Sequence, residues 1–138
     1  MSSAAVGVGD RLVCQMGIGL ALLVGVHKDD TEDDARKLAD RVFGMRIFDD
    51  ADGKINLALS AVEGEVLAVS NFTVYGDASQ RRPSFALSAG FDRGLELFDL
   101  FVAELRKLEV VVHTGEFGAD MRVAICNEGP VTLVVDTR

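Results

Sequence analysis

EVLAVSNFTVY, residues 65–75, is the stretch that says most about the fold. After the glutamate come four consecutive apolar side chains, and the stretch then turns polar at Ser70, Asn71 and Thr73. A short continuous apolar run of this kind is typical of a strand buried in the core. The change to polar side chains predicts that the strand ends at a functional edge of the sheet.

Three short strands are predicted before this stretch. The Gly9-Asp10 pair and the glycines Gly17 and Gly19 divide residues 6–26 into apolar segments, which we interpret as a meander. A helix is expected after Asp29-Asp30-Thr31, which offers an N-cap, because acidic residues fill its first turn and apolar residues recur at helical spacing. The predicted length of this helix is about 14 residues.

The second half of the chain predicts another helix and the remaining strands. Residues 91–108 carry one apolar stripe at helical spacing, and strands are expected near residues 110–113, 121–126 and 131–136. Two helices among about seven or eight strands, mostly joined by short turns, predict an α/β layered domain with a largely antiparallel β-sheet. We expect residues 1–138, with 49% hydrophobic content, to form this single domain.

Charge and hydropathy exclude several classes of partner. The chain has 14 basic against 22 acidic residues and a net charge of −8, which argues against broad binding to DNA or RNA through phosphates. A small basic patch can still grip a short RNA end. No apolar run reaches the roughly 18 residues of a membrane span, and the N-terminus lacks the features of a secretion signal. We therefore expect a cytoplasmic protein with no membrane partner.

Neither a metal nor a cofactor is expected from the motifs. Cys14 and Cys126 lie in apolar strand-like runs without CxxC or CxxxH spacing, so we interpret both as reduced core thiols. The loop DDADG, residues 49–53, lacks the ligand spacing and terminal Glu of a calcium loop and is predicted to be a solvated turn. P-loop and dinucleotide-binding motifs are absent.

Conventional acid–base catalysis finds little support in the sequence. Ser70 and Thr73 are candidate hydroxyl nucleophiles, but a hydrolase of the usual kind places a histidine and a carboxylate beside one of them. His27 and His113 are interpreted as residues at strand ends, and no GxSxG or HExxH motif occurs. If the protein is an enzyme, we expect backbone groups to take the place of these side chains.

The stretch CNEGPVTLVVD, residues 126–136, offers such backbone groups. Gly129-Pro130 stands directly before a β-branched run that favours a strand. An X–Pro bond adopts the cis form at a cost of only about 0.5–1 kcal/mol. Two carbonyls fixed in this way can bind an ammonium group and exclude a substituent by steric clash. The alternative is a plain turn between the last two strands.

Three motifs together resemble one family, the D-aminoacyl-tRNA deacylases. They are SNFTVYGD…RRPSF (residues 70–85), GEFGADM (115–121) and NEGPVT (127–132), and residues 19–59 have the family's pattern as well. The resemblance covers nearly the whole chain in order. It implies a barrel-like D-tyrosyl-tRNA deacylase fold and an enzyme of translation proofreading. Such an enzyme hydrolyses the ester that joins a D-amino acid, or glycine, to the 3′ end of tRNA and releases free tRNA.

The resemblance also implies a homodimer with active sites at the subunit interface. Gly129 and Pro130 of each subunit enter the partner's site in that family. There the two carbonyls hold the α-ammonium group, and the shape of the motif rejects L-amino acids. Because only the atoms around Cα are recognised, many D-side chains are accepted and glycine is not excluded.

The other expected site residues come from the same resemblance. They are catalytic residues (Ser70, Asn71, Phe72 and Thr73), pocket walls (Phe117, Ala119 and Met121) and candidates for phosphate contact (Arg81 and Arg82). Thr73 matches a residue sometimes assigned as nucleophile. We favour instead an oxyanion site formed by the N–H groups of Phe72 and Thr73, with water activated by the terminal ribose 2′-hydroxyl. Arg81 and Arg82 are equally consistent with a solvated basic loop.

Two features depart from the family pattern. Asn71 replaces the family's Gln, and the family's first strand, with its Arg and Gln, is expected to be missing before residues 2–8. These departures keep open a non-catalytic binder of a D-amino acid or an RNA 3′ end. A thiol enzyme that uses Cys126 with His113 is a second alternative.

Overall fold

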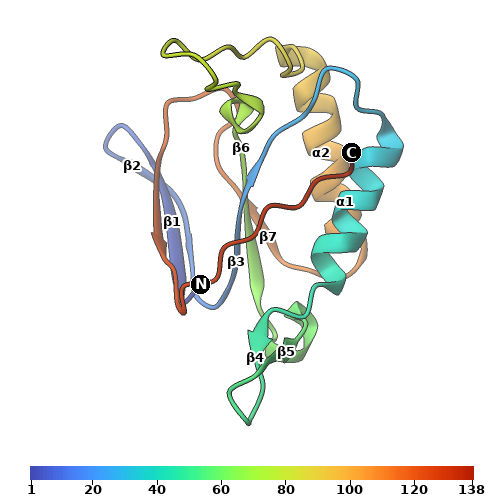
Figure 1. Ribbon diagram of the computed structural model, residues 1–138. Helices are drawn as coiled ribbons and strands as arrows, with labels where there is room; N and C mark the ends of the chain where they lie inside the picture. The colour runs from blue at the N-terminus through green and yellow to red at the C-terminus, as the bar shows by residue number, and fades with distance from the viewer.

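The computed structural model describes residues 1–138, arranged in three layers (Figure 1). The first layer is an antiparallel sheet in the order β2-β1-β8, with β1 (Ser3–Val8), β2 (Arg11–Met16) and β8 (Arg122–Cys126). The second is a parallel sheet in the order β3-β6-β7, with β3 (Gly19–Val24), β6 (Glu65–Ser70) and β7 (Val112–Thr114). The third consists of the helices α1 (Glu32–Gly44) and α2 (Phe91–Lys107). Smaller elements are the hairpin of β4 (Phe48–Asp49) and β5 (Ile55–Leu57) and the 3₁₀ helices η1 (Leu59–Val62) and η2 (Phe72–Tyr75).

β6 is the middle strand of the middle layer, and both of its faces are buried. Leu67 and Val69 pack against β1 and β2 of the first sheet, whereas Val66 and Ala68 pack against the helices. Each of these four side chains is at most 4% exposed. A strand covered on both faces needs apolar side chains throughout, which explains the continuous run at the start of residues 65–75.

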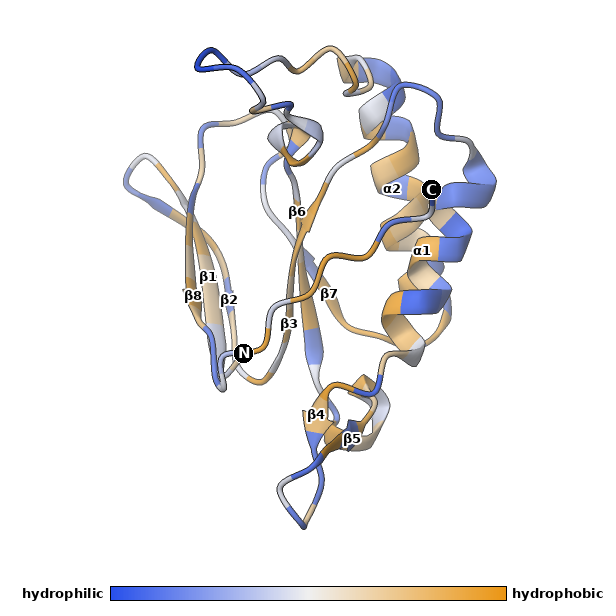
Figure 2. Cartoon of the chain, viewed as in Figure 1, coloured by the Kyte–Doolittle hydropathy of each residue, from blue (hydrophilic) through white to orange (hydrophobic).

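The two helices cover the face of the parallel sheet that β1 and β2 leave free. α1 starts after Thr31, whose N–H donates to the Asp34 carboxylate at 2.9 Å. This carboxylate also lies at the positive end of the helix dipole. Figure 2 shows the apolar side of both helices turned toward the sheet and the hydrophilic side turned outward. Both predicted helices are therefore confirmed, as is the cap at Thr31.

The third predicted strand is present but does not continue the meander. β3 leaves the β1–β2 hairpin and pairs in parallel with β6, with Gly19 opposite Glu65. A side chain at Gly19 has no room, since its Cβ would lie 1.7 Å from the Glu65 carbonyl oxygen. Glycine therefore allows the close approach of backbones at which the chain passes from the first sheet to the second.

The prediction of a strand at residues 131–136 is wrong. This segment runs on from β8, crosses β3 and ends beside α1 (Figure 1), and none of its backbone groups joins a β-ladder. Its β-branched side chains favour extended backbone, but they do not supply a neighbouring strand edge.

The predicted class, a layered α/β fold, is confirmed, and three of its five strand pairings are antiparallel. Two details differ from the expectation: the middle sheet is parallel, and the sheets do not close into a barrel. Closure fails within one chain because β8 and β2 remain the edges of the first sheet. Neither helix is long and apolar enough to cross a membrane.

Candidate active site

A cavity of about 500 Å³ lies at the carboxyl end of β6. Its lining includes six of the predicted site residues, namely Ser70, Asn71, Phe72, Phe117, Ala119 and Met121. The structure thus brings the polar end of β6 together with the turn before β8. Sequence reasoning missed the other lining residues, which are Leu23, Val26, Val69, Ala89, Gly90, Phe91, Gly94, Gly118 and Val123. None of the side chains that line the cavity is ionisable.

The polar edge after β6 folds back on itself as a capped turn. β6 ends at Ser70, and Asn71 donates its N–H to the Val24 carbonyl at 2.8 Å. The Asn71 side-chain oxygen accepts hydrogen bonds from the Thr73 N–H at 3.2 Å and from the Thr73 hydroxyl at 2.6 Å. Asn is among the best capping residues because its short side chain reaches the N–H two residues on. The Asn71 side-chain amide therefore stabilises the turn that Asn71 itself begins.

Phe72 presents a free N–H at this turn. No group of the chain accepts a hydrogen bond from it, whereas its carbonyl accepts one from the Ser88 hydroxyl at 2.6 Å. The Phe72 ring packs edge-to-face on Phe85, with ring centroids 5.2 Å apart. The loop at residues 77–90 therefore holds the turn in place while one backbone donor remains available beside the cavity.

Aromatic rings form the opposite wall. Phe117 packs edge-to-face on Phe91, with centroids 5.0 Å apart, and lies 6.1 Å from Phe98. Gly118 has a φ of +79°, and a Cβ there would lie 2.8 Å from the Phe91 ring. The backbone conformation favours glycine here, and a Cβ would also require the Phe91 ring to move. An ion pair between Arg11 and Glu116, at 2.6 Å, ties this turn to the start of β2.

The N-terminus of α2 borders the cavity. Gly90 caps the helix without a side-chain hydrogen bond, and Gly90, Phe91 and Gly94 all line the space. The first N–H groups of a helix lack partners within it and give this end a partial positive charge. The sequence placed the start of α2 correctly but carried no sign that it would border the site.

Three groups of predicted site residues lie outside the cavity. The Thr73 hydroxyl is bonded to Asn71, and Thr73 does not line the space. Arg81 and Arg82 are exposed on the loop at 77–90 and form no ion pair. Gly129 and Pro130, joined by a cis peptide bond, are exposed as well.

Gly129 and Pro130 belong to the end of the sheets that is remote from the cavity. They follow β8, whose last residue, Cys126, pairs with Ser3. The neighbouring N-terminal amine donates to the Gly19 carbonyl at 2.9 Å, and Gly19 pairs with the first residue of β6. The cavity lies at the last residue of β6, five steps or about 17 Å along the strand. The two residues therefore do not complete the cavity of their own chain.

The thiol-enzyme alternative is not supported by the structure. His113 is hydrogen-bonded to Glu65 at 3.0 Å, Cys126 lies on the exposed edge strand β8, and neither lines the cavity. The expectation that Cys126 is a core thiol is also wrong, because nothing within the chain covers this edge of the sheet. Cys14 is partly buried, and burial raises the pKa of its thiol.

The whole chain is similar to proteins of one family. The family model described as D-Tyr-tRNA(Tyr) deacylase matches residues 1–136. A D-aminoacyl-tRNA deacylase of Thermotoga petrophila is 48% identical, over 99% of this chain and 93% of its own. A protein of Bacillus subtilis named inactive D-aminoacyl-tRNA deacylase is also 48% identical, over 94% of this chain and 98% of its own.

The fold is similar to that of solved structures. One titled c-Myc DNA unwinding element binding protein superposes with a TM-score of 0.93 at 29% identity, over 99% of this chain and 94% of that one. The fold and the sequence thus agree over nearly the full length, and they confirm the resemblance carried by the motifs at residues 70–85, 115–121 and 127–132. This chain belongs to the D-Tyr-tRNA(Tyr) deacylase family.

Proposed function

We propose that this protein hydrolyses the ester bond of D-aminoacyl-tRNA, releasing free tRNA and the D-amino acid. The observation that carries the proposal is the cavity at the end of β6, which is lined by Phe72, whose backbone N–H has no acceptor in the chain, and by no ionisable side chain. Membership of the deacylase family supplies the substrate class.

Catalysis relies on the backbone of the turn after β6. Water attacks the ester carbonyl, and the negative charge that develops on the carbonyl oxygen is stabilised by the Phe72 N–H. The C–O bond to the ribose 3′-oxygen then breaks, and that oxygen takes up a proton. Since no side chain of the cavity can act as a base, the ribose 2′-hydroxyl of the tRNA accepts a proton from the attacking water while its own proton passes to the departing 3′-oxygen.

Thr73 is not the nucleophile in this proposal. Its hydroxyl donates to Asn71 at 2.6 Å and does not line the cavity. Its N–H donates to the same oxygen at 3.2 Å, so it is already engaged and Phe72 is the main oxyanion donor. Thr73 therefore supports the turn without forming an acyl intermediate.

Selection against L-amino acids comes from a second copy of the chain. Gly129 and Pro130 lie at the end of β6 remote from their own cavity and are exposed, so they are free to enter the cavity of a partner. The flanking segments carry the exposed apolar side chains Ile125, Leu133 and Val134, at 43%, 57% and 94% exposure. Exposed apolar groups of this kind are typical of a surface that a partner covers. Glycine has no side chain for the motif to reject, so glycyl-tRNA is also a substrate.

Mixing two inactive variants tests this arrangement. One variant blocks the cavity, Ala119→Trp, and the other, Gly129→Val, alters the inserted motif, whose carbonyls in this proposal also hold the substrate's α-ammonium group. Mixed dimers contain one intact cavity facing one intact motif, so activity should recover to about a quarter of the wild-type sites. No recovery between variants that demonstrably exchange subunits would contradict a shared site.

The loop at residues 77–90 contacts the tRNA end. Arg81 and Arg82 are exposed and unpaired, and Phe85 and Ser88 fasten their loop to the turn that carries Phe72. Two free cations this close to the site suit the phosphates near the 3′ end of a tRNA. Because the chain is acidic overall, this contact is local.

A second candidate function is a non-catalytic binder of the same substrate. It is favoured by the Bacillus subtilis relative, which is named inactive at 48% identity. Incubation with D-tyrosyl-tRNA distinguishes the two: an enzyme releases D-tyrosine with turnover, whereas a binder slows spontaneous hydrolysis of the ester. Protection of the ester at saturating protein would contradict the proposed activity.

A further inference from the structure

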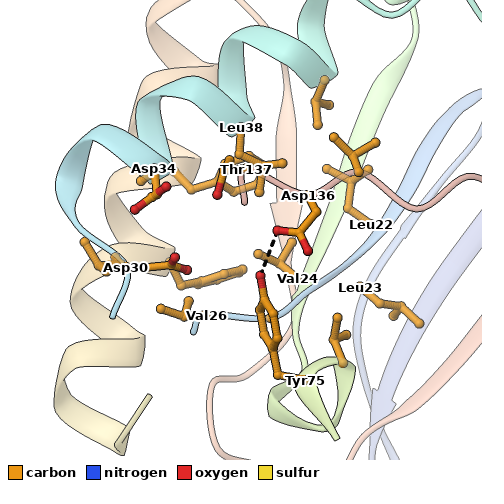
Figure 3. A pocket seen from close by; sticks show the side chains of 18 of the residues that line it. Leu22, Leu23, Val24, Val26, Asp30, Asp34, Leu38, Tyr75, Asp136 and Thr137 are labelled. Atoms are coloured by element: carbon orange, nitrogen blue, oxygen red, sulfur yellow. Dashed lines mark hydrogen bonds between the residues drawn. The ribbon is translucent and has the colours of Figure 1, made fainter. Parts of the chain in front are cut away.

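The C-terminal segment, residues 131–138, is held in place by side chains alone. Its residues make no backbone–backbone hydrogen bond. Asp136 is its main anchor, since its carbonyl accepts from Arg41 at 2.5 Å and its carboxylate accepts from the Tyr75 hydroxyl at 3.1 Å (Figure 3). Arg138 adds an ion pair with Asp30 at 2.8 Å.

Tyr75 stands at the end of the turn that carries the proposed oxyanion donor. It is the last residue of η2, three positions after Phe72. Its ring is partly buried and packs edge-to-face on His27, with centroids 5.1 Å apart. Burial, together with the charge of the nearby Asp136 carboxylate, raises the pKa of Tyr75 to about 12. The hydroxyl therefore keeps its proton at neutral pH and donates it to Asp136.

The segment between the two anchors is short. At its start the Asn127 amide donates to the Thr132 hydroxyl at 2.9 Å, and Asp136 lies only six residues after Pro130. An extended chain of six residues spans at most about 20 Å, so a fixed Asp136 limits where Gly129 and Pro130 can lie. Loss of the Tyr75–Asp136 bond loosens this limit, because only the side-chain contacts of Arg41 and Arg138 then hold the end of the segment and no ladder hydrogen bond supports it.

We propose that Tyr75 and Asp136 are positioning residues that fix the Gly129-Pro130 turn relative to η2. This inference rests on the proposed function, in which that turn enters the cavity of a partner. In such a dimer the Tyr75–Asp136 bond connects the turn lining one cavity to the motif that completes the other. It therefore sets how firmly the motif rejects L-amino acids.

The test compares D- and L-tyrosyl-tRNA hydrolysis in three variants. Tyr75→Phe and Asp136→Ala remove the bond, and we expect the ratio of D to L rates to fall about tenfold, as for loss of one hydrogen bond to a charged group. Asp136→Asn keeps an acceptor for the tyrosine and should retain most of the selectivity. Arg36→Gln, which removes the ion pairs of Arg36 with Asp33 and with Glu104 of α2 and leaves Tyr75 and Asp136 untouched, is the matched control.

A second measurement does not depend on activity. In the ¹⁵N relaxation of Tyr75→Phe, order parameters for residues 131–135 should fall below about 0.6, with α1 unchanged. Parallel loss of D and L activity, or unchanged order parameters in a folded Tyr75→Phe, overturns the positioning role. Failure of the wild-type chain to hydrolyse D-tyrosyl-tRNA overturns the proposed function instead, and the relaxation data still decide the positioning role.

Discussion

Replacement of Asn71 by Ala tests whether the capped turn orients the Phe72 N–H, the proposed oxyanion donor. The substitution removes the oxygen that accepts hydrogen bonds from the Thr73 N–H and hydroxyl, at 3.2 and 2.6 Å. Loss of a capping side chain costs about 1 kcal/mol. With an unfolding entropy of about 2 cal/mol/K per residue over 138 residues, this corresponds to a fall in Tm of about 4 °C.

The effect on catalysis should be larger than the effect on stability. Complete removal of one oxyanion donor lowers kcat by about 10²–10³. Asn71→Ala leaves the Phe72 N–H present but less well directed, so we expect kcat for D-tyrosyl-tRNA to fall by about tenfold to hundredfold. The assay is single-turnover release of D-tyrosine at a temperature well below the Tm of the variant.

Asp50→Ala is the matched control for this variant. Asp50 caps the loop between β4 and β5 in the same way, accepting from the Asp52 and Lys54 N–H groups at 2.9 and 3.0 Å, and it does not line the cavity. It should lose similar stability and keep wild-type kcat. If Asn71→Ala loses stability but keeps its kcat, the orientation of the Phe72 N–H does not depend on the Asn71 cap. That result would contradict the proposed link between the capped turn and catalysis.

Three further predictions concern single positions. Thr73→Val keeps the N–H but removes the hydroxyl, so D-tyrosyl-tRNA hydrolysis should continue within about threefold; complete loss, with no acyl-enzyme trapped, would favour a direct role for the hydroxyl. Gly118→Ala combines a φ of +79° with a Cβ 2.8 Å from the Phe91 ring, so denaturant unfolding should show a loss of more than about 1 kcal/mol. The Thr31 N–H lowers the pKa of Asp34 below 3.8, so the stability it adds is present above that pH and is lost on acidification below it. Urea titrations of wild type and Asp34→Asn should therefore converge at low pH, and a constant difference would contradict this role.

Part of the site could be predicted from local sequence. The apolar run at 66–69 needs a strand buried on both faces, and the switch at Ser70 marks where that burial ends. The polar residues that follow the strand were therefore predicted to lie at an edge of the sheet. In the structure Ser70 and Asn71 line the cavity at that edge. The capping pattern at Thr31 also depends only on neighbouring residues.

The rest depends on contacts between distant segments. Residues 20–24 favour a strand whether they pair with β2 or with β6, and the pairing with β6 goes with packing against helices that are distant in sequence. Residues 131–136 favour extended backbone, but their path is set by Arg41 and Tyr75, which are remote in sequence. The N-terminus of α2 also reaches the cavity through contacts between distant segments. The sequence around Gly90 and Phe91 therefore does not indicate that these residues line the cavity.

The central claim is that the ester is cleaved with main-chain groups of the protein and a hydroxyl of the substrate. Single-turnover hydrolysis of D-tyrosyl-tRNA whose terminal ribose lacks the 2′-hydroxyl tests it most directly. The account predicts a rate at least about 10² lower than with normal tRNA, since general base catalysis contributes about 10²–10⁴. Hydrolysis of the deoxy substrate at the normal rate would contradict it and would require a base from the protein.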